Sequence, residues 1–112
     1  MTNQRLGESY VERAQARLPF LRQMQVVGLH ADVVRGCQEV VELALKGLLR
    51  MVGVDPPKEH DVSKYLVIHE ERLPPSVRSH VQEIRHVSKR LRRERELAFY
   101  GDEDFVPSDE YD

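Results

Sequence analysis

Residues 31–52 constrain the fold of this chain more than any other stretch. Their apolar residues recur at spacings of three and four, and comprise Val33, Cys37, Val40, Val41, Ala44, Leu45, Leu48, Leu49 and Val52. On an α-helix this spacing makes one broad apolar stripe. Val34 and Leu43 widen the stripe beyond a single face, so the sequence predicts a central helix that packs against more than one neighbour.

A first helix is predicted over residues 8–27, where apolar residues again follow helical spacing. Pro19 lies inside this segment. Because proline lacks a backbone N–H and clashes with the preceding turn, we expect a kink there or two shorter helices. Gly28 ends the segment, and the short loop that follows predicts an antiparallel hairpin with the central helix.

Two further helices are predicted after the central one. Pro56 and Pro57 stop the central helix, because neither can continue it. Asp61 is placed to cap a short helix that runs through Ile68. Pro75 suits the first turn of a last helix, which is predicted from residue 76 to about residue 98.

Length and composition favour one all-helical domain over residues 1–112. Hydrophobic residues make up 40% and charged residues 32% of the chain, which suits a single core. No apolar run approaches the ~18 residues of a membrane span, and the N-terminus lacks the apolar core of a signal peptide. We therefore expect a soluble cytoplasmic protein that does not associate with membranes.

The last predicted helix places a charged residue on its apolar side. Its apolar positions follow one another at seven-residue intervals, in the series Val77, Ile84, Leu91, Ala98 and the companion series Val81, Ser88, Arg95. Arg95 therefore occupies an inward or interface position. Since an unpaired buried guanidinium is costly, we expect Arg95 to line a groove, to face a second subunit or to pair with an acid among residues 102–104.

Basic residues crowd the same helix, and an acidic tail follows it. The basic cluster comprises Arg85, Lys89, Arg90, Arg92, Arg93 and Arg95, whereas every charged residue of the 101–112 tail is acidic. One interpretation is a surface that binds phosphates. The other is a solvated helix face that makes local ion pairs. No aromatic ladder for stacking single-stranded bases accompanies the cluster, and we predict no DNA partner.

The cysteine and histidine pattern predicts neither a metal nor a cofactor. Cys37 is the only cysteine, so there is no internal disulfide. It lies on the apolar stripe of the central helix, where we expect a buried, inert thiol. His60, His69, His80 and His86 contain no pair at the four-residue spacing of a zinc-binding helix.

Three segments, in this order, resemble the HEPN domain of prokaryotes. They are QEVVELALKGLL at 38–49, GVDPPKEHDV at 53–62 and LRRERELAFYGDED at 91–104. The resemblance implies an up-and-down antiparallel helical bundle, here with four main helices, that forms a homodimer. It also implies binding of nucleotide or RNA, and operation beside a minimal nucleotidyltransferase as a toxin and antitoxin pair. His60 and Asp61 fall in the HDV turn, which we expect to hold a loop onto the bundle.

Many HEPN proteins are metal-independent ribonucleases, whose site is an arginine followed a short interval later by a histidine, assembled across the dimer. Arg95 matches this arginine best, but Tyr100 stands where the histidine is expected. A tyrosine, with an unperturbed pKa of about 10, is a poor general base near neutral pH, although it can donate a hydrogen bond to a phosphate. The nearest counterpart of the catalytic pair is Arg95 with Tyr100. The predicted ligand-binding residues are Arg92, Arg95, Glu96, Tyr100 and Asp102.

In HEPN proteins the stretch that matches residues 107–112 leads into a final long helix. We therefore expect that helix to be absent or truncated here, and a second subunit or another protein to cover the apolar groove. Three hypotheses stay open. The chain is a non-catalytic module that binds nucleotide, RNA or a nucleotidyltransferase partner, a metal-independent endoribonuclease that uses Arg95, or a structural helical dimer without a ligand.

Overall fold

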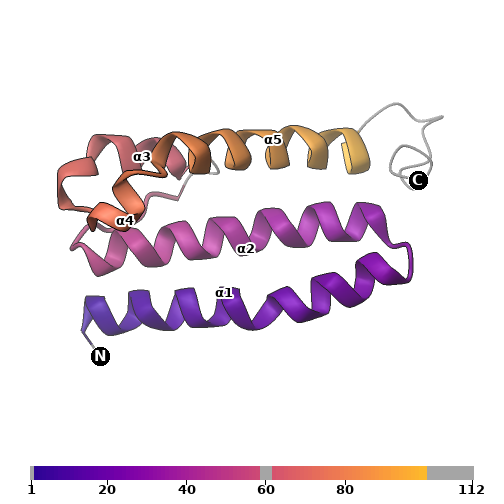
Figure 1. Cartoon of the computed structure of the whole chain (residues 1–112), viewed down its shortest axis with the longest axis horizontal. Coiled ribbons are helices and arrows are strands. Elements are labelled where there is room, and N and C mark those ends of the chain that lie inside the picture. Colours follow the sequence, from indigo (N-terminus) through magenta and orange to yellow (C-terminus); the bar gives the residue numbers. More distant parts are fainter. Residues whose placement is uncertain (1, 59–61, 101–112) are drawn as a thin grey trace.

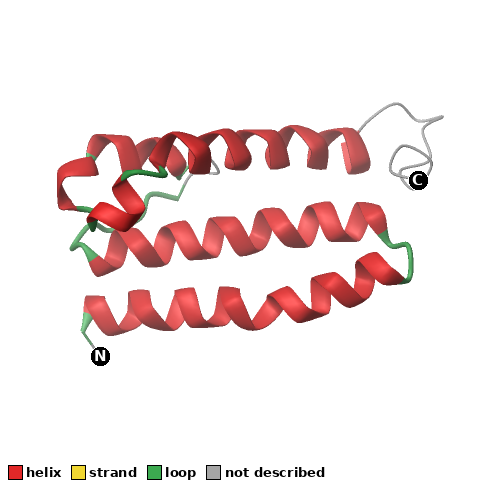
Figure 2. Cartoon of the chain, in the orientation of Figure 1, coloured by secondary structure: helices red, strands yellow, loops and turns green. Residues whose placement is uncertain are grey.

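The computed structural model describes residues 2–58 and 62–100, with the backbone alone for residues 95 and 97–100. Within these ranges every regular element is a helix (Figure 2). Three helices are long, namely α1 (Asn3–Val26), α2 (His30–Met51) and α5 (Val81–Tyr100). The short helices α3 (Ser63–Ile68) and α4 (Pro75–Arg78), with a 3₁₀ turn at Glu70–Arg72 between them, connect α2 to α5. The all-α prediction is confirmed.

The long helices form an up-and-down bundle with α2 in the middle (Figure 1). Helix α1 packs along one side of α2 and α5 packs along another, and both run antiparallel to it (Figure 1). Helix α3 packs against both α2 and α5 at the end of the bundle where α2 finishes. The central helix therefore has several neighbours, as its wide apolar stripe predicts.

Two glycines end α1 and α2 in the same way. Gly28 has a φ of 85° and Gly53 a φ of 84°, a left-handed conformation that glycine adopts readily. After Gly28, Leu29 donates its backbone N–H to the Met24 carbonyl at 3.0 Å, and the residue after Gly53 makes the equivalent bond at 2.9 Å. Such bonds satisfy carbonyls that a helix end leaves free. The turn at Gly28 makes the predicted hairpin between α1 and α2.

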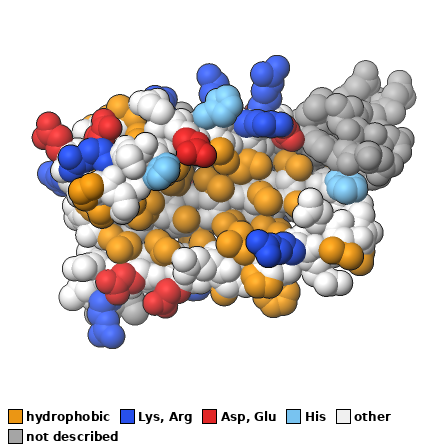
Figure 3. Space-filling view, in the orientation of Figure 1, with side chains coloured by type: hydrophobic (Ala, Val, Ile, Leu, Met, Phe, Trp, Pro, Cys, Tyr) orange, Lys and Arg blue, Asp and Glu red, His pale blue; other side chains and the backbone are white. Residues whose placement is uncertain are grey.

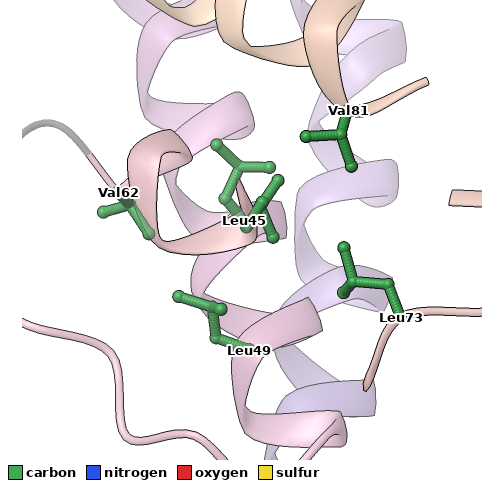
Figure 4. Close-up of a cluster of buried hydrophobic side chains, with 6 residues drawn as sticks. Leu45, Leu49, Val62, Leu73 and Val81 are labelled. Atoms are coloured by element: carbon green, nitrogen blue, oxygen red, sulfur yellow. The ribbon is translucent and has the colours of Figure 1, made fainter. Parts of the chain in front are cut away.

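The most buried side chains gather at the end of the bundle where α3 and α4 lie (Figure 4). We call this cluster the closed end, and it comprises Leu45, Leu49, Val62, Leu66, Leu73 and Val81. Leu49 and Leu66 have no exposed surface. Because full burial of a leucine side chain contributes about 1.5–3 kcal/mol, this cluster contributes strongly to the stability of the fold.

Helices α1 and α2 approach each other closely beside the closed end. A Cβ atom on Gly47 would lie 2.7 Å from the Gly7 carbonyl oxygen and 2.9 Å from Val11 Cγ2. A Cβ atom on Gly7 would lie 2.5 Å from the Gly47 carbonyl oxygen. Real Cβ atoms do not come so close to backbone atoms, so these two glycines let the helices pack backbone against backbone.

The opposite end of the bundle, at the α1–α2 hairpin, leaves large apolar side chains exposed. We call these residues the open end, and they comprise Leu18, Phe20, Val26, Val27 and Leu29. Phe20 is 71% exposed and Val26 is 80% exposed. Hydrophobic side chains also spread over the face between α5 and α1 (Figure 3). The apolar side chains of the described bundle are therefore not confined to its core.

The predicted boundaries of the first helix need correction. Helix α1 begins at Asn3 rather than at residue 8, because the Oγ1 atom of Thr2 accepts the Arg5 backbone N–H at 3.1 Å and caps the helix. It continues through Pro19 as a single helix, so the two-helix alternative is wrong. Its two halves are inclined to each other (Figure 1). Pro19 is exposed, and solvent can therefore satisfy the carbonyl that the proline leaves without a donor.

The predicted boundaries after α2 also differ from the structure. The N-cap of α3 is Val62 and makes no side-chain cap, and Asp61 and His60 lie outside the described residues. The predicted last helix is two helices, since α4 ends at Arg78 and α5 begins at Val81. The Arg78 side chain donates hydrogen bonds to two carbonyls of the segment before α4, at 3.1 and 3.0 Å. Pro75 begins α4 as predicted.

Candidate functional site

Helix α5 turns one face into the bundle and carries its charges on the others. Val81 and Ser88 are buried, and Ile84 packs against the closed end. These positions, spaced by three and four residues, agree with the inward face that the sequence predicts. Lys and Arg side chains project from the α5 edge of the molecule (Figure 3). The candidate site lies where the inward face meets this charged surface.

A pocket of about 290 Å³ lies between α5 and the start of α3. Its described lining residues are Ser63, Gln82, Arg85, His86, Lys89 and Arg92. The five α5 residues are separated by one or three positions, so their side chains form one stripe along the helix beside the buried face. Ser63 comes from α3 and is only 2% exposed. We call this site the α3–α5 pocket.

The electrostatics of the α3–α5 pocket are one-sided. Arg85, Lys89 and Arg92 are cationic, and no acidic side chain is among the described residues that line the pocket. Arg85 and Arg92 are half-buried, and the Nε atom of Arg92 is out of contact with solvent. Cations held close together at a partly desolvated surface attract an anion more strongly than the same charges spread through water.

The rest of the predicted basic cluster behaves differently. Arg90 Nε lies 3.0 Å from Glu94 Oε1, one helical turn along, and Arg90 is largely exposed. This is the local ion pair of a solvated helix face, which contributes little to stability. Arg93 is exposed and does not line the pocket. Arg90 therefore lies on a solvated helix face with a local ion pair, as one interpretation predicts, and phosphate binding stays a prediction for the residues that line the pocket.

Two comparisons with known proteins found nothing and a third identifies the family. A scan against models of protein families matches residues 8–112 to the HEPN domain. The chain belongs to the HEPN domain family. No curated protein and no solved structure showed a significant match. The match spans nearly the whole of the described bundle, so α1, α2, α3 and α5 are elements of one HEPN domain.

The structure places the predicted site residues of this HEPN domain only in part. Arg92 lines the α3–α5 pocket and Glu96 is exposed one turn further along α5. Arg95 and Tyr100 lie in the last turns of α5, but their side chains are outside what the structure describes. Asp102 falls beyond the described residues. The pairing of Arg95 with Tyr100 therefore stays a prediction.

Sequence reasoning missed three residues of the α3–α5 pocket. Gln82 and His86 share the helical spacing of Arg85, Lys89 and Arg92, so a search for polar residues on one stripe of the last helix would have found them. Ser63 carries no such signal. It reaches the pocket because α3 packs on α5, and that contact depends on the tertiary fold.

The single thiol of the HEPN domain lies away from the pocket. Cys37 is half-buried and packs against the small cluster of Ala14, Leu21 and Val40 between α1 and α2. Burial raises the pKa of the Cys37 thiol above its ordinary value. The thiol that the sequence predicts to be buried is therefore of intermediate exposure. In the part of the chain that the structure describes, no helix is long and apolar enough to cross a membrane.

Proposed function

We propose that this HEPN domain protein is a non-catalytic binding component of a toxin-antitoxin-like or nucleotidyltransferase-associated system, in which α5 holds a nucleotide or RNA ligand. The observation that carries the proposal is the convergence of Arg85, Lys89 and Arg92 on the α3–α5 pocket. Nucleotides and RNA share the phosphate group, and arginine and lysine are the side chains that bind it most strongly.

The charge balance of the pocket supports an anionic ligand. Arg90 already has an acid one helical turn away, whereas Arg85 and Lys89 make no ion pair within the described residues. A phosphate in the pocket would supply a negative charge beside Arg85 and Lys89. Binding of this kind releases counterions, so its affinity falls as the salt concentration rises.

Fluorescence anisotropy with a labelled single-stranded RNA tests the proposal. We expect binding that weakens steeply between about 50 and 200 mM salt. Lys89→Gln weakens it, whereas Lys58→Gln, which removes the same charge from an exposed position outside the described pocket lining, leaves it nearly unchanged. If neither RNA nor nucleoside mono- or triphosphates bind at low salt, the proposal is wrong.

The same RNA also separates binding from cleavage. A binding module leaves the RNA intact over hours in the presence of EDTA. Cleavage that persists in EDTA and disappears in Arg95→Ala would replace the proposal with a metal-independent endoribonuclease. Circular dichroism of the variant establishes that it is folded. Intact RNA in the presence of demonstrated binding supports the non-catalytic assignment.

The open end supports a protein partner, and we expect it to be a second copy of this chain. Phe20, Val26 and Val27 are the most exposed large apolar side chains there, and large exposed apolar side chains are common at interfaces. Light scattering after gel filtration measures the mass, with a dimer expected. Co-expression with a nucleotidyltransferase encoded beside this chain tests the two-component system, and a stable complex is the expected result.

A further inference from the structure

We infer that His86 is a ligand-binding residue of the α3–α5 pocket, and that its protonation makes the affinity for an anionic ligand depend on pH. This inference rests on the proposed function and adds to it how binding is regulated. Histidine is the side chain whose ordinary titration falls between about pH 5 and 8. His86 lines the pocket together with Arg85 and Lys89, and arginine and lysine side chains are ordinarily cationic over this range.

His86 is placed to add its charge to those of its neighbours. It directly follows Arg85, and it lies one helical turn before Lys89 on the same stripe of α5. Among the described residues, neither His86 nor these two cations makes an ion pair or a side-chain hydrogen bond. Both ring nitrogens of His86 are therefore available, and both become donors to phosphate oxygens when the ring is protonated.

Two other charged residues lie within one turn of His86 on α5, and each has a partner. Glu83 Oε2 lies 3.3 Å from the Nδ1 atom of His80, and Arg90 Nε lies 3.0 Å from Glu94 Oε1. Neither Glu83 nor Arg90 is among the described residues that line the pocket. Within that described lining, a protonated His86 has no acid to pair with, and an anionic ligand would be its counter-ion.

The helices that pack against α5 add no charged side chain to the described lining. Helix α3 contributes Ser63, which is neutral. The ammonium group of the next residue, Lys64, lies 5.3 Å from the centre of the Tyr65 ring and is not part of the lining. Helix α2 packs on the inner side of α5 and contributes no lining residue. Protonation of His86 is therefore the one change of charge expected in the described lining between about pH 5 and 8.

The direction of the effect follows from linkage between proton and ligand. A protonated His86 attracts an anion and donates charge-assisted hydrogen bonds to it, whereas the neutral ring offers one ordinary donor. Affinity for an anion therefore rises as the pH falls. By reciprocity, a bound anion favours the protonated ring over the neutral one.

Fluorescence anisotropy with a 5′-hydroxyl oligouridylate tests the inference, because its phosphodiesters and uracils keep their charge over this pH range. We expect the full chain to bind it about fivefold more tightly at about pH 5.5 than at about pH 8, since one charge-assisted contact is gained. The slope of log affinity against log salt should also steepen by about 0.7, the value for one more phosphate neutralised on a single strand. The 3′ fluorophore is one that does not titrate in this range.

A nucleoside 3′,5′-cyclic monophosphate, measured by calorimetry, separates the two sources of phosphate. Its phosphodiester also keeps a single charge over this range, so the pH acts on the protein alone. Tighter binding of the cyclic nucleotide than of the strand assigns a free nucleotide as the ligand, and the reverse assigns RNA. In either case the inference is supported when affinity rises as the pH falls.

Three variants assign the pH dependence to one residue. His86→Gln cannot gain a charge, and we expect it to bind at both pH values as weakly as the wild-type chain does at about pH 8. His86→Lys is charged throughout and should bind at about pH 8 as tightly as the wild-type chain does at about pH 5.5. His80→Gln removes a histidine outside the described lining and should keep the wild-type pH dependence. His86 is exposed, so its variants do not disturb the core, and circular dichroism establishes folding at each pH.

Two outcomes would overturn the inference, and they have different meanings for the proposed function. Binding that is equal at the two pH values, or a pH dependence that survives in His86→Gln, shows that His86 does not contact the ligand as a cation. The proposed function then stands and the inference is wrong. If neither RNA nor nucleotides bind the wild-type chain at any pH, both are wrong.

Discussion

The closed end and the open end of the bundle contain similar residues but bury them very differently. Leu66 at the closed end has no exposed surface, whereas Leu18 at the open end is 46% exposed. Residues from α2, α3, α5 and the turns between them meet at the closed end. The buried group nearest the open end comes from α1 and α2 alone. Burial at each end therefore depends on how many elements meet there. Apolar content alone does not decide which side chains are covered.

The difference separates the two functions that we propose for the bundle. The α3–α5 pocket adjoins the closed end, since Ser63 of its wall follows Val62 of the buried cluster. Packed neighbours fix the backbone of such a site, and a fixed backbone keeps its cations in position. The open end has apolar surface without a cover, and such surface suits another protein chain. One end thus supports a ligand site while the other supports an interface.

The largest expected effect is the replacement of a closed-end leucine. Leu66→Ala is expected to lower the free energy of unfolding by about 2–5 kcal/mol, because it removes buried methyl groups and leaves a cavity. Leu18→Ala makes the same chemical change at the open end and is expected to cost about 1 kcal/mol or less. Urea denaturation followed by circular dichroism measures both values.

These two variants test whether the two ends differ in burial in solution. If the two variants lose similar stability, Leu18 is covered in solution by something outside the described residues. Repeating the denaturation over a range of protein concentrations identifies that cover. A loss for Leu18→Ala that grows with concentration points to a second copy of the chain, because self-association stabilises the folded state by mass action.

A glycine pair gives the next largest effect. Gly47→Ala near the closed end would bring its Cβ within 2.7 Å of the Gly7 carbonyl oxygen, a backbone atom that cannot move alone. We expect a loss of about 1–3 kcal/mol from this overpacking. Gly36→Ala nearer the open end meets only the tip of the Leu21 side chain, which can change rotamer. Thermal unfolding should show a much smaller shift for Gly36→Ala, and equal shifts would contradict the difference in packing.

Much of the fold was predictable because helix patterning is local. The apolar stripe of residues 31–52 gave α2 to within a residue at each end, and Gly28 gave the hairpin. One error arose at a turn that interrupts the helical spacing. The apolar positions Val77 and Val81 follow helical spacing and predict one helix, whereas residues 79–80 form a turn between α4 and α5. No spacing pattern in the sequence shows that turn.

The candidate site was predictable only to the level of one helix. The sequence placed a basic cluster on the last helix, and the pocket indeed lies there. Which cations act together depended on the turn-by-turn direction of their side chains and on the position of α3. Arg90 pairs with Glu94, while Arg85 and Lys89 line the pocket together with Ser63. The spacing of residues in the sequence identified the last helix. The packing of α3 against it determines which of its residues line the pocket.

A smaller effect on stability is expected at the tip of the open end. Phe20→Ser removes a side chain that is 71% exposed, so the free energy of unfolding of the monomer should change by about 0.5 kcal/mol or less. Self-association should weaken clearly, because aromatic side chains contribute much of the energy of an interface. Gln23→Ser, at a nearby exposed polar position, is the control and should leave association unchanged. A dimer that persists unchanged in Phe20→Ser would remove this surface from the interface.

The reactivity of Cys37 gives the smallest and most local test. Burial raises the pKa of this thiol, so the folded chain favours the neutral thiol more than the unfolded chain does. The stability that results is fully present below the pKa of the unfolded thiol, and it is lost as the pH rises through the higher pKa of the folded one. Because the thiolate is the nucleophile, iodoacetamide should alkylate Cys37 severalfold more slowly in the native chain than in urea.

A second cysteine at the closed end sharpens this measurement. In a Cys37→Ser background, Val62→Cys places a thiol where the native side chain is only 1% exposed. We expect it to react only when the bundle unfolds, whereas half-buried Cys37 reacts through small local openings as well. The native alkylation rate of Cys37 should therefore exceed that of the closed-end thiol. Equal rates would mean that both ends open together in a single global unfolding, and the difference in cover would then have no counterpart in local stability.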